Sequence, residues 1–237
     1  MLNVVYHCAG VGNWKTVVTE QFGVLREAGL TNVNSVHLGE DLQWFIAEAK
    51  RQQINLKVNF HNPCLKKYEF AAMALTQKVA KESSNPILYF HTKGVSVPID
   101  DHRQKWRKMM ETHVIKDWRQ NLTYLQDHDV VGVNWIPCST PPWITKLAWM
   151  RPHFTGNFWI ASAEWIRALP DFNCFLSDFY FLTEANMRFV AELWHGCLPW
   201  VRPKSLVCTD KPFWESRFNF DTLELSPTTI KTSVNHR

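Results

Sequence analysis

The sequence predicts an α/β fold in which a mainly parallel, twisted sheet is flanked by helices. Strand-like runs alternate with helical stretches from the first residues onward. A crossover of helical length returns the chain in its original direction, so successive strands are expected to be parallel. The chain has 237 residues and is 46% hydrophobic, which is enough apolar material for one sizeable core.

The first strand and the first helix are expected at 2–6 and 14–28. LNVVY is β-branched and apolar, and the strand is expected to break at His7. From Trp14 to Ala28 apolar residues recur with helical spacing, which predicts one buried face. Gly29 follows at the position of a C-cap glycine, so the helix should end there.

Three more strands and two more helices complete the first half of the chain. The strands are rich in β-branched residues or alternate apolar with polar side chains, and the helices show single apolar faces. The expected strands are 33–38, 54–60 and 86–90, and the expected helical faces are Leu42, Phe45, Ile46 and Ala49 and, within 68–81, Ala71, Ala72, Leu75 and Val79.

The second half has longer and less regular segments. A Pro- and Trp-rich loop at 137–152 is too long for a simple connector, and we expect it to act as a lid or as a platform for a bound ligand. No domain boundary is evident, so one domain is expected over 1–225, followed by a tail at 226–237. The other expected elements are a long amphipathic helix at 103–126, a strand at 129–136, an extended segment beginning at 153 and a helix at 182–196.

Composition excludes several classes of protein. The net charge of +4 is small and the basic residues are interspersed with acidic ones, so a nucleic-acid-binding protein is not expected. The six cysteines form no CxxC pair, which argues against a zinc knuckle. No apolar run of transmembrane length and no secretory leader occurs, so a cytoplasmic protein is expected, with peripheral membrane contact left open.

Two loops follow strands whose carboxyl ends should meet at one edge of the sheet, where α/β proteins bind ligands. The first, HCAGVGNWK, contains Gly10 and Gly12 but lacks the third glycine of a dinucleotide fingerprint. Its backbone N–H groups could hold a nucleotide phosphate at the start of the following helix. A plain strand–helix turn that needs small residues explains the loop equally well.

The second loop, HTKG, follows the fourth strand. Lys93 offers a mobile positive charge suited to phosphate oxygens, His91 is a hydrogen-bond donor or an acid–base group, and Thr92 adds a hydroxyl. Gly94 lets the backbone approach a ligand closely. The alternative is a solvated lysine and a histidine whose hydrogen bonds are satisfied within the protein.

A third segment, HFTGNFWIAS, carries hydrogen-bonding groups without charge. His153, Thr155 and Asn157 alternate with Phe154, Gly156 and Phe158, which predicts an extended segment with one polar face. Such a row of side chains, together with the flanking tryptophans, suits a hydroxyl-rich ligand such as a sugar. A half-buried strand that faces water explains the alternation too, although not the lack of charge.

These motifs resemble a known family. PILYFHTKGVSV, the Trp-bearing helix after it, VVGVNW and HFTGNFWIASAEWIRALP are similar to glycosyltransferase-like proteins with a GT-A-type fold, which includes relatives of rhamnan-synthesis proteins. The resemblance spans roughly residues 1–200. It implies a hexosyl- or deoxyhexosyltransferase that uses a nucleotide sugar as donor and a glycan or polysaccharide as acceptor, with a nucleotide-binding half at 1–100 and an acceptor half at 101–225.

The chain departs from the GT-A pattern at the metal-binding motif. His91-Thr92-Lys93 stands where the family has an Asp-x-Asp motif that holds a divalent metal, and Asp100 and Asp101 come several residues later. No metal-ligating residues are therefore assigned, while use of Mn²⁺ or Mg²⁺ is left open. We expect Lys93 to stabilise the leaving diphosphate in place of the metal.

The resemblance also suggests roles for individual residues. Carboxylates that could take the acceptor proton are Glu184, Glu192 and Asp178, each of which also has an ordinary structural explanation. A non-catalytic carbohydrate- or nucleotide-binding protein of the same fold is the alternative. The assigned residues are Lys93, His91, Glu184 and Glu192 as catalytic, His7, Gly10, Gly12, Asn13, Thr92, Gly94, Arg103 and Arg107 as donor-binding, and Asn134, Trp135, His153, Thr155, Gly156 and Asn157 as acceptor-binding.

Overall fold

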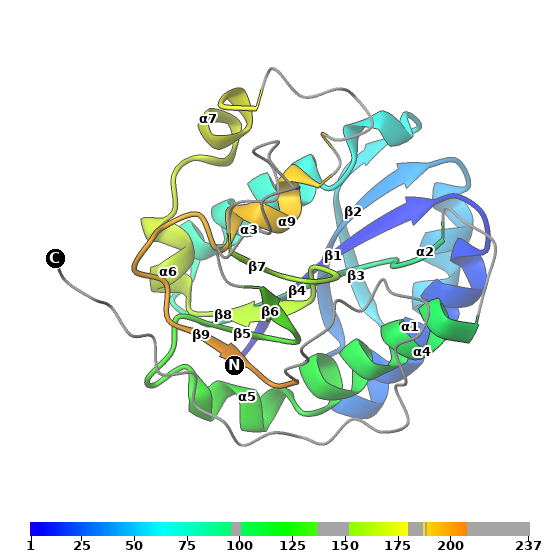
Figure 1. Cartoon of the computed structure of the whole chain (residues 1–237). Helices are drawn as coiled ribbons and strands as arrows, with labels where there is room; N and C mark the ends of the chain where they lie inside the picture. Colours follow the sequence, from blue (N-terminus) through cyan, green and yellow to red (C-terminus); the bar gives the residue numbers. More distant parts are fainter. Residues whose placement is uncertain (96–100, 137–151, 180–186, 188, 208–237) are drawn as a thin grey trace, which may run out of the picture.

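A computed structural model describes residues 1–95, 101–136, 152–179, 187 and 189–207 (Figure 1). Seven strands form one sheet in the order β3-β2-β1-β4-β8-β5-β9. Neighbouring strands are parallel except at β8, which is antiparallel to both β4 and β5. The expected mainly parallel sheet is confirmed. The strands are β1 (Asn3–Gly10), β2 (Asn32–Gly39), β3 (Asn55–Asn62), β4 (Ile87–His91), β5 (Val130–Gly132), β8 (Trp159–Ala161) and β9 (Pro203–Ser205), and β6 (Trp135–Ile136) pairs separately with β7 (His153–Phe154).

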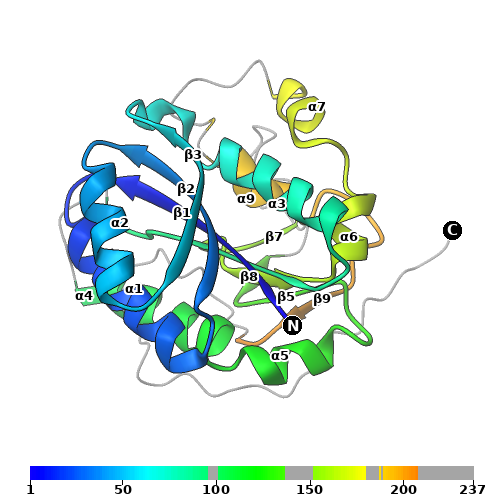
Figure 2. The ribbon, with the colours of Figure 1, turned by 180° about the vertical axis from the view of Figure 1, so that it is seen from behind.

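Helices cover both faces of the sheet (Figures 1 and 2). One layer contains α1, α2, α4 and α5, and the other contains α3, α6, α7 and α9; the side chains of each layer pack into a core cluster of their own. None of the described helices combines the length and apolarity needed to cross a membrane. The helices are α1 (Trp14–Ala28), α2 (Leu42–Arg51), α3 (Phe70–Glu82), α4 (Asp101–Met110), α5 (Trp118–Tyr124), α6 (Ala163–Ala168), α7 (Phe172–Ser177) and α9 (Val190–Trp194), with short helical turns at η1 (Leu65–Lys67) and η2 (Glu111–Lys116).

The sheet buries aromatic side chains on both faces because strand residues alternate between them. Tyr6 stacks on Phe90 from the neighbouring strand, with ring centroids 4.5 Å apart, in the layer that contains α1. Tyr89 and Trp159 lie in the other layer, with centroids 5.2 Å apart. Burial of each such ring contributes about 1.5–3 kcal/mol to the free energy of folding.

Helix α1 has the predicted bounds, and its end has the predicted cap. Gly29 adopts the left-handed conformation, with φ of 74°. The backbone N–H groups of Gly29 and Leu30 donate to the carbonyls of Arg26 and Leu25, which satisfies the end of the helix.

Several local predictions are wrong. Strand β1 continues through His7 to Gly10 because it pairs with β2 along its whole length. Ile46 is 41% exposed and does not face the core with Phe45. The expected long helix is interrupted by the π-helical turn η2, and the expected strand at 129–136 divides where Asn134 has φ of 52°.

Other predictions fall outside the described residues. The loop at 137–151, most of the helix expected from 182 and the tail at 226–237 are not described. The proposed lid, the two halves and the domain limits therefore stay predictions.

Candidate functional site

The HTKG loop lies against the end of β1 at the carboxyl edge of the sheet. His7 and His91 are directly opposite each other in the β1–β4 pairing. The backbone N–H of Thr92 donates to the carbonyl of His7 at 3.0 Å, and its hydroxyl accepts from the N–H of Ala9 at 2.8 Å. The Thr92 side chain is 3% exposed, so it does not face solvent. Its hydroxyl links the start of the HTKG loop to the end of β1.

Gly12 brings the Gly-rich loop into contact with the end of the HTKG loop. Its φ is 61°, and a Cβ atom placed on it would lie 2.0 Å from the carbonyl oxygen of Val95. Only glycine fits this backbone conformation and this close approach. Gly10, by contrast, faces the end of β2, where an added Cβ would lie 3.0 Å from the carbonyl oxygen of Leu38. The expectation that the two loops share one edge of the sheet is confirmed.

Lys93 is held between the two helical layers. Its ammonium nitrogen lies 4.6 Å from the centre of the Trp106 ring in α4 and 3.7 Å from a carboxylate oxygen of Glu192 in α9. The side chain is 20% exposed. The cation–π contact and the partly buried ion pair both fix the position of the ammonium group. Lys93 and Glu192, assigned separately from the sequence, are therefore direct neighbours.

His91 is buried beside Lys93. Its Nε2 donates to the carbonyl of Gly156 at 2.9 Å, which leaves Nδ1 as the unprotonated nitrogen of the neutral ring. Burial lowers the pKa of His91 to about 4, the charge of Lys93 adds to this effect, and the hydrogen bond to Gly156 and the charge of Glu192 oppose it. The ring is neutral at pH 7.

Glu69 is a buried carboxylate next to His91 that the sequence analysis did not single out. Its Oε1 lies 3.6 Å from Nδ1 of His91, while its Oε2 accepts hydrogen bonds from the hydroxyl of Tyr89 and from the amide of Asn157. Glu69 directly precedes α3. An acidic residue at the start of a helix was the only feature of the local sequence that could have drawn attention to Glu69. The signal is weak because many such residues only complement the helix dipole.

His7 and Asn13 present unsatisfied polar atoms at the same edge. Burial lowers the pKa of His7 to about 4; the charge of Glu69 opposes this effect, and His91 and His37 add to it. His7 Nδ1 and Asn13 Oδ1 are both buried without a hydrogen-bond partner among the described residues. Buried polar atoms are normally paired, so the lack of partners for these two atoms is unusual.

The two arginines assigned to the donor lie in different surroundings. Arg103 is exposed, and its Cβ lies 3.8 Å from the position that a Cβ on Gly94 would take, so it borders the HTKG loop. Arg107 is 4% exposed and donates to Glu20 of α1 at 2.7 Å. The donor-binding assignment of Arg107 is therefore corrected: its guanidinium joins α4 to α1 inside the protein.

The segment assigned to the acceptor is a buried turn, not an extended strand with a polar face. Gly156 and Asn157 have φ of 90° and 56° and connect β7 to β8. Asn134 donates to the hydroxyl of Thr155 at 3.0 Å, and Asn157 accepts from the indole of Trp159 at 2.8 Å. Internal hydrogen bonds explain the uncharged side chains without an acceptor.

The remaining acceptor residues are also enclosed, with His153 at 3% exposure and Trp135 half-buried against Phe154 and His195. The buried side chains of this segment therefore do not contact an acceptor directly, and the carbonyl of Gly156 accepts a hydrogen bond from His91 instead. A Cβ on Gly156 would lie 2.5 Å from the sulfur of Met110, which shows how tightly the turn is packed.

Among the described residues, only one of the three carboxylates that were predicted to take the acceptor proton is found in the site. Glu192 lies in the site, Asp178 is exposed at the end of α7, and Glu184 lies outside the described residues. Within the described part of the chain, no group of three or more His, Cys, Asp or Glu side chains is arranged to hold a metal ion.

No protein-family model and no curated protein sequence matches this chain. Among solved structures, HddC from Yersinia pseudotuberculosis is 12% identical with a TM-score of 0.42, covering 72% of this chain and 80% of that one. The same protein complexed with GMP-PN has a TM-score of 0.43 at the same identity and coverage. A 4-diphosphocytidyl-2C-methyl-D-erythritolsynthase from Anaerococcus prevotii is 11% identical with a TM-score of 0.45, covering 88% of this chain and 89% of that one. Likenesses of this size carry no argument about activity.

Proposed function

We propose that the protein binds a nucleotide sugar at the carboxyl edge of its sheet and transfers the sugar to a glycan acceptor. The observation that carries the proposal is the position of Lys93, a partly exposed cation held beside the loop that contains Gly12. A diphosphate bound to this loop would lie at the start of α1, where the N-terminus of a helix favours an anion. Arg103 adds a second cation at the border of the HTKG loop.

In the proposed reaction, the bond between the anomeric carbon and the diphosphate oxygen breaks, and its electron pair stays on the diphosphate. Lys93 stabilises the negative charge that develops there. The acceptor oxygen forms the new bond to the anomeric carbon and loses its proton. Glu192 receives that proton in this proposal, because a diphosphate that attracts Lys93 weakens the ion pair and leaves the carboxylate free to act as a base.

The buried groups behind Lys93 have a positioning role. Glu69 holds Asn157 and Tyr89 by hydrogen bonds and adjoins His91, whose other nitrogen binds the carbonyl of Gly156. Because these groups are buried and hydrogen-bonded, they restrict the movement of β4, which ends at His91, two residues before Lys93.

The test is the release of nucleoside diphosphate from a panel of nucleotide sugars, with a glycan acceptor mixture, in EDTA and in Mn²⁺. Lys93→Ala should weaken donor binding or turnover by about 10- to 100-fold, the effect of removing a hydrogen bond to a charged group. Lys204→Ala is the matched control, because its ammonium group also lies over an aromatic ring, at 5.0 Å from the centre of Tyr124 in α5.

Equal activity of Lys93→Ala and Lys204→Ala would contradict the proposal, as would activity that depends strictly on Mn²⁺. Binding of nucleotide sugars without release of diphosphate would favour the non-catalytic alternative. One observation agrees with that alternative: the carboxylate of Glu192 lies 3.7 Å from the ammonium nitrogen of Lys93, which lowers the positive potential available to a phosphate.

A further inference from the structure

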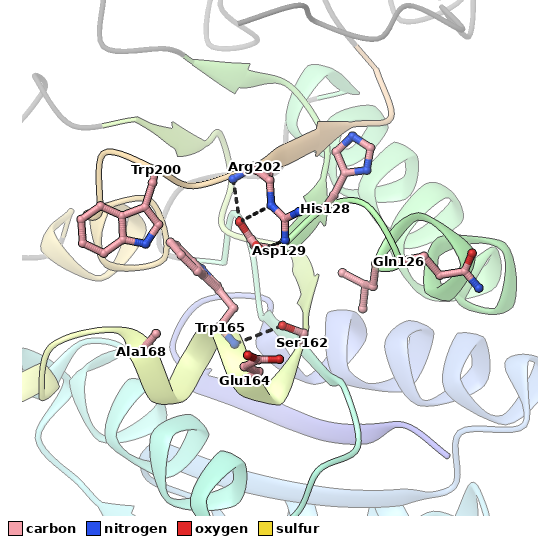
Figure 3. A pocket seen from close by; sticks show the side chains of 10 residues that line it. Gln126, His128, Asp129, Ser162, Glu164, Trp165, Ala168, Trp200 and Arg202 are labelled. Atoms are coloured by element: carbon pink, nitrogen blue, oxygen red, sulfur yellow. Dashed lines mark hydrogen bonds and ion pairs between the residues drawn. The ribbon is translucent and has the colours of Figure 1, made fainter. Parts of the chain in front are cut away.

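A hollow of about 380 Å³ opens at the other edge of the sheet, and no step of the proposed transfer uses it (Figure 3). It lies where β5 and β9 begin and where β8 ends. Ala161, the last residue of β8, pairs with Ile87 at the start of β4, whereas His91 ends β4. The hollow is therefore separated from Lys93 by at least the length of β4, roughly 13 Å.

An exposed tryptophan borders this hollow. Trp200 is 64% exposed, the largest fraction among the exposed large hydrophobic side chains of the described residues after Met1. Trp165 lies beside it in Figure 3 and is anchored by its indole N–H, which donates to the carbonyl of His195 at 3.1 Å. An indole left in water beside a hollow offers a flat apolar surface to a ligand.

Polar groups with fixed positions line the same hollow. The carboxylate of Asp129 accepts from the guanidinium of Arg202 at 2.7 Å and from its backbone N–H at 2.8 Å. Arg202 is 63% exposed, so the donors that do not bind Asp129 remain accessible. Glu164 is exposed on α6 and adds acceptor oxygens. The pair formed by Asp129 and Arg202 is thus a rigid donor–acceptor set next to Trp200.

The charges around this hollow disfavour an anionic ligand. The hydrogen bonds from Arg202 to Asp129 raise the pKa of the guanidinium, and the charges of Asp129, Asp127 and Glu164 add to this effect. Three carboxylates against one guanidinium repel a phosphate. A neutral ligand with many hydroxyl groups and one apolar face fits both the charges and the indole.

We propose that this hollow is a second carbohydrate-binding site, which takes a neutral sugar unit of a glycan with its apolar face on Trp200 and its hydroxyl groups on Asp129, Arg202 and Glu164. Its volume lies within the usual range for small-ligand pockets, roughly 300–1,000 Å³. Binding here does not require transfer at the other edge of the sheet, so the two proposals succeed or fail separately.

The test is saturation-transfer NMR and calorimetry with neutral tetrasaccharides of glucose, mannose, galactose and rhamnose. At least one should bind, and Trp200→Ala should weaken its binding by about tenfold or more, the effect expected for one lost aromatic contact. Phe60→Ala is the matched control, because Phe60 is an aromatic side chain that is 39% exposed on the distant strand β3. Glu164→Gln, a second exposed change, should weaken binding several-fold without affecting the fold.

Three results would overturn the proposal. They are no binding by any tetrasaccharide at about 10 mM, equal binding by Trp200→Ala and Phe60→Ala, and displacement of the tetrasaccharide by uridine diphosphate. Lys93→Ala should leave this binding unchanged, so a failure of the donor site and a failure of this site give different results.

Discussion

Replacement of Gly12 by alanine tests the contact that joins the two loops of the candidate site. The new Cβ would lie 2.0 Å from the carbonyl oxygen of Val95, whereas real Cβ contacts essentially never fall below 3.0 Å. The neighbour is backbone and cannot rotate away, so the exposed Gly12 must move from buried Val95 by roughly 1 Å. Alanine is also disfavoured at φ of 61°.

These two effects give the size of the expected loss. The left-handed backbone costs about 1–2 kcal/mol for a residue with a Cβ, and the backbone shift that relieves the overlap with Val95 costs about 1–3 kcal/mol. We therefore expect Gly12→Ala to lower the free energy of unfolding by about 2–5 kcal/mol, a large part of the 5–15 kcal/mol typical of a domain. Urea unfolding, followed by circular dichroism, measures the change.

Gly23→Ala is the internal control for this measurement. Gly23 lies in the middle of α1, and a Cβ there would have no atom within 4 Å. Alanine should therefore stabilise the protein by about 0.5–1 kcal/mol, through better helix propensity. If Gly12→Ala unfolds within about 0.5 kcal/mol of the unsubstituted protein, the two loops do not touch, and the site inferred from their contact would have to be abandoned.

Two further predictions concern pH. His7, His37 and His91 each have a pKa lowered by burial to about 4, so between pH 6.5 and 4 the unfolded chain binds more protons. Stability should therefore fall on acidification through this range, by up to roughly 1.4 kcal/mol per pH unit for each ring. His91→Gln should make the slope of urea-derived stability against pH shallower, and an unchanged slope would show that this ring does not resist protonation. Burial raises the pKa of Glu111 to about 7, an effect that nearby Arg107 opposes. Its stabilising effect is complete below pH 4.5 and is lost as pH rises through 7, so Glu111→Gln should raise the free energy of unfolding at pH 8 by about 1–3 kcal/mol. An unchanged or lower melting temperature for this variant at pH 8 would mean that the carboxylate is adequately compensated by Arg107.

The elements that the sequence predicts well are those whose signals are local. Helix α1 has the predicted limits because its apolar period and its C-cap glycine lie within one short segment. The same reasoning places the two loops at one edge, since parallel strands bring their carboxyl ends together. It fails at 153–161, where a buried turn has the same alternation of polar and apolar residues as a strand.

The sequence by itself determined the alternating elements, the parallel sheet and the edge to which His91 and Lys93 belong. Only the tertiary structure decided which groups meet there: Glu69 beside His91, Glu192 beside Lys93, and Arg107 directed toward Glu20. The physical reason is the range of the forces that act. Backbone periodicity and capping depend on neighbours along the chain, whereas ion pairs and buried hydrogen bonds depend on which distant segments the packed layers bring into contact.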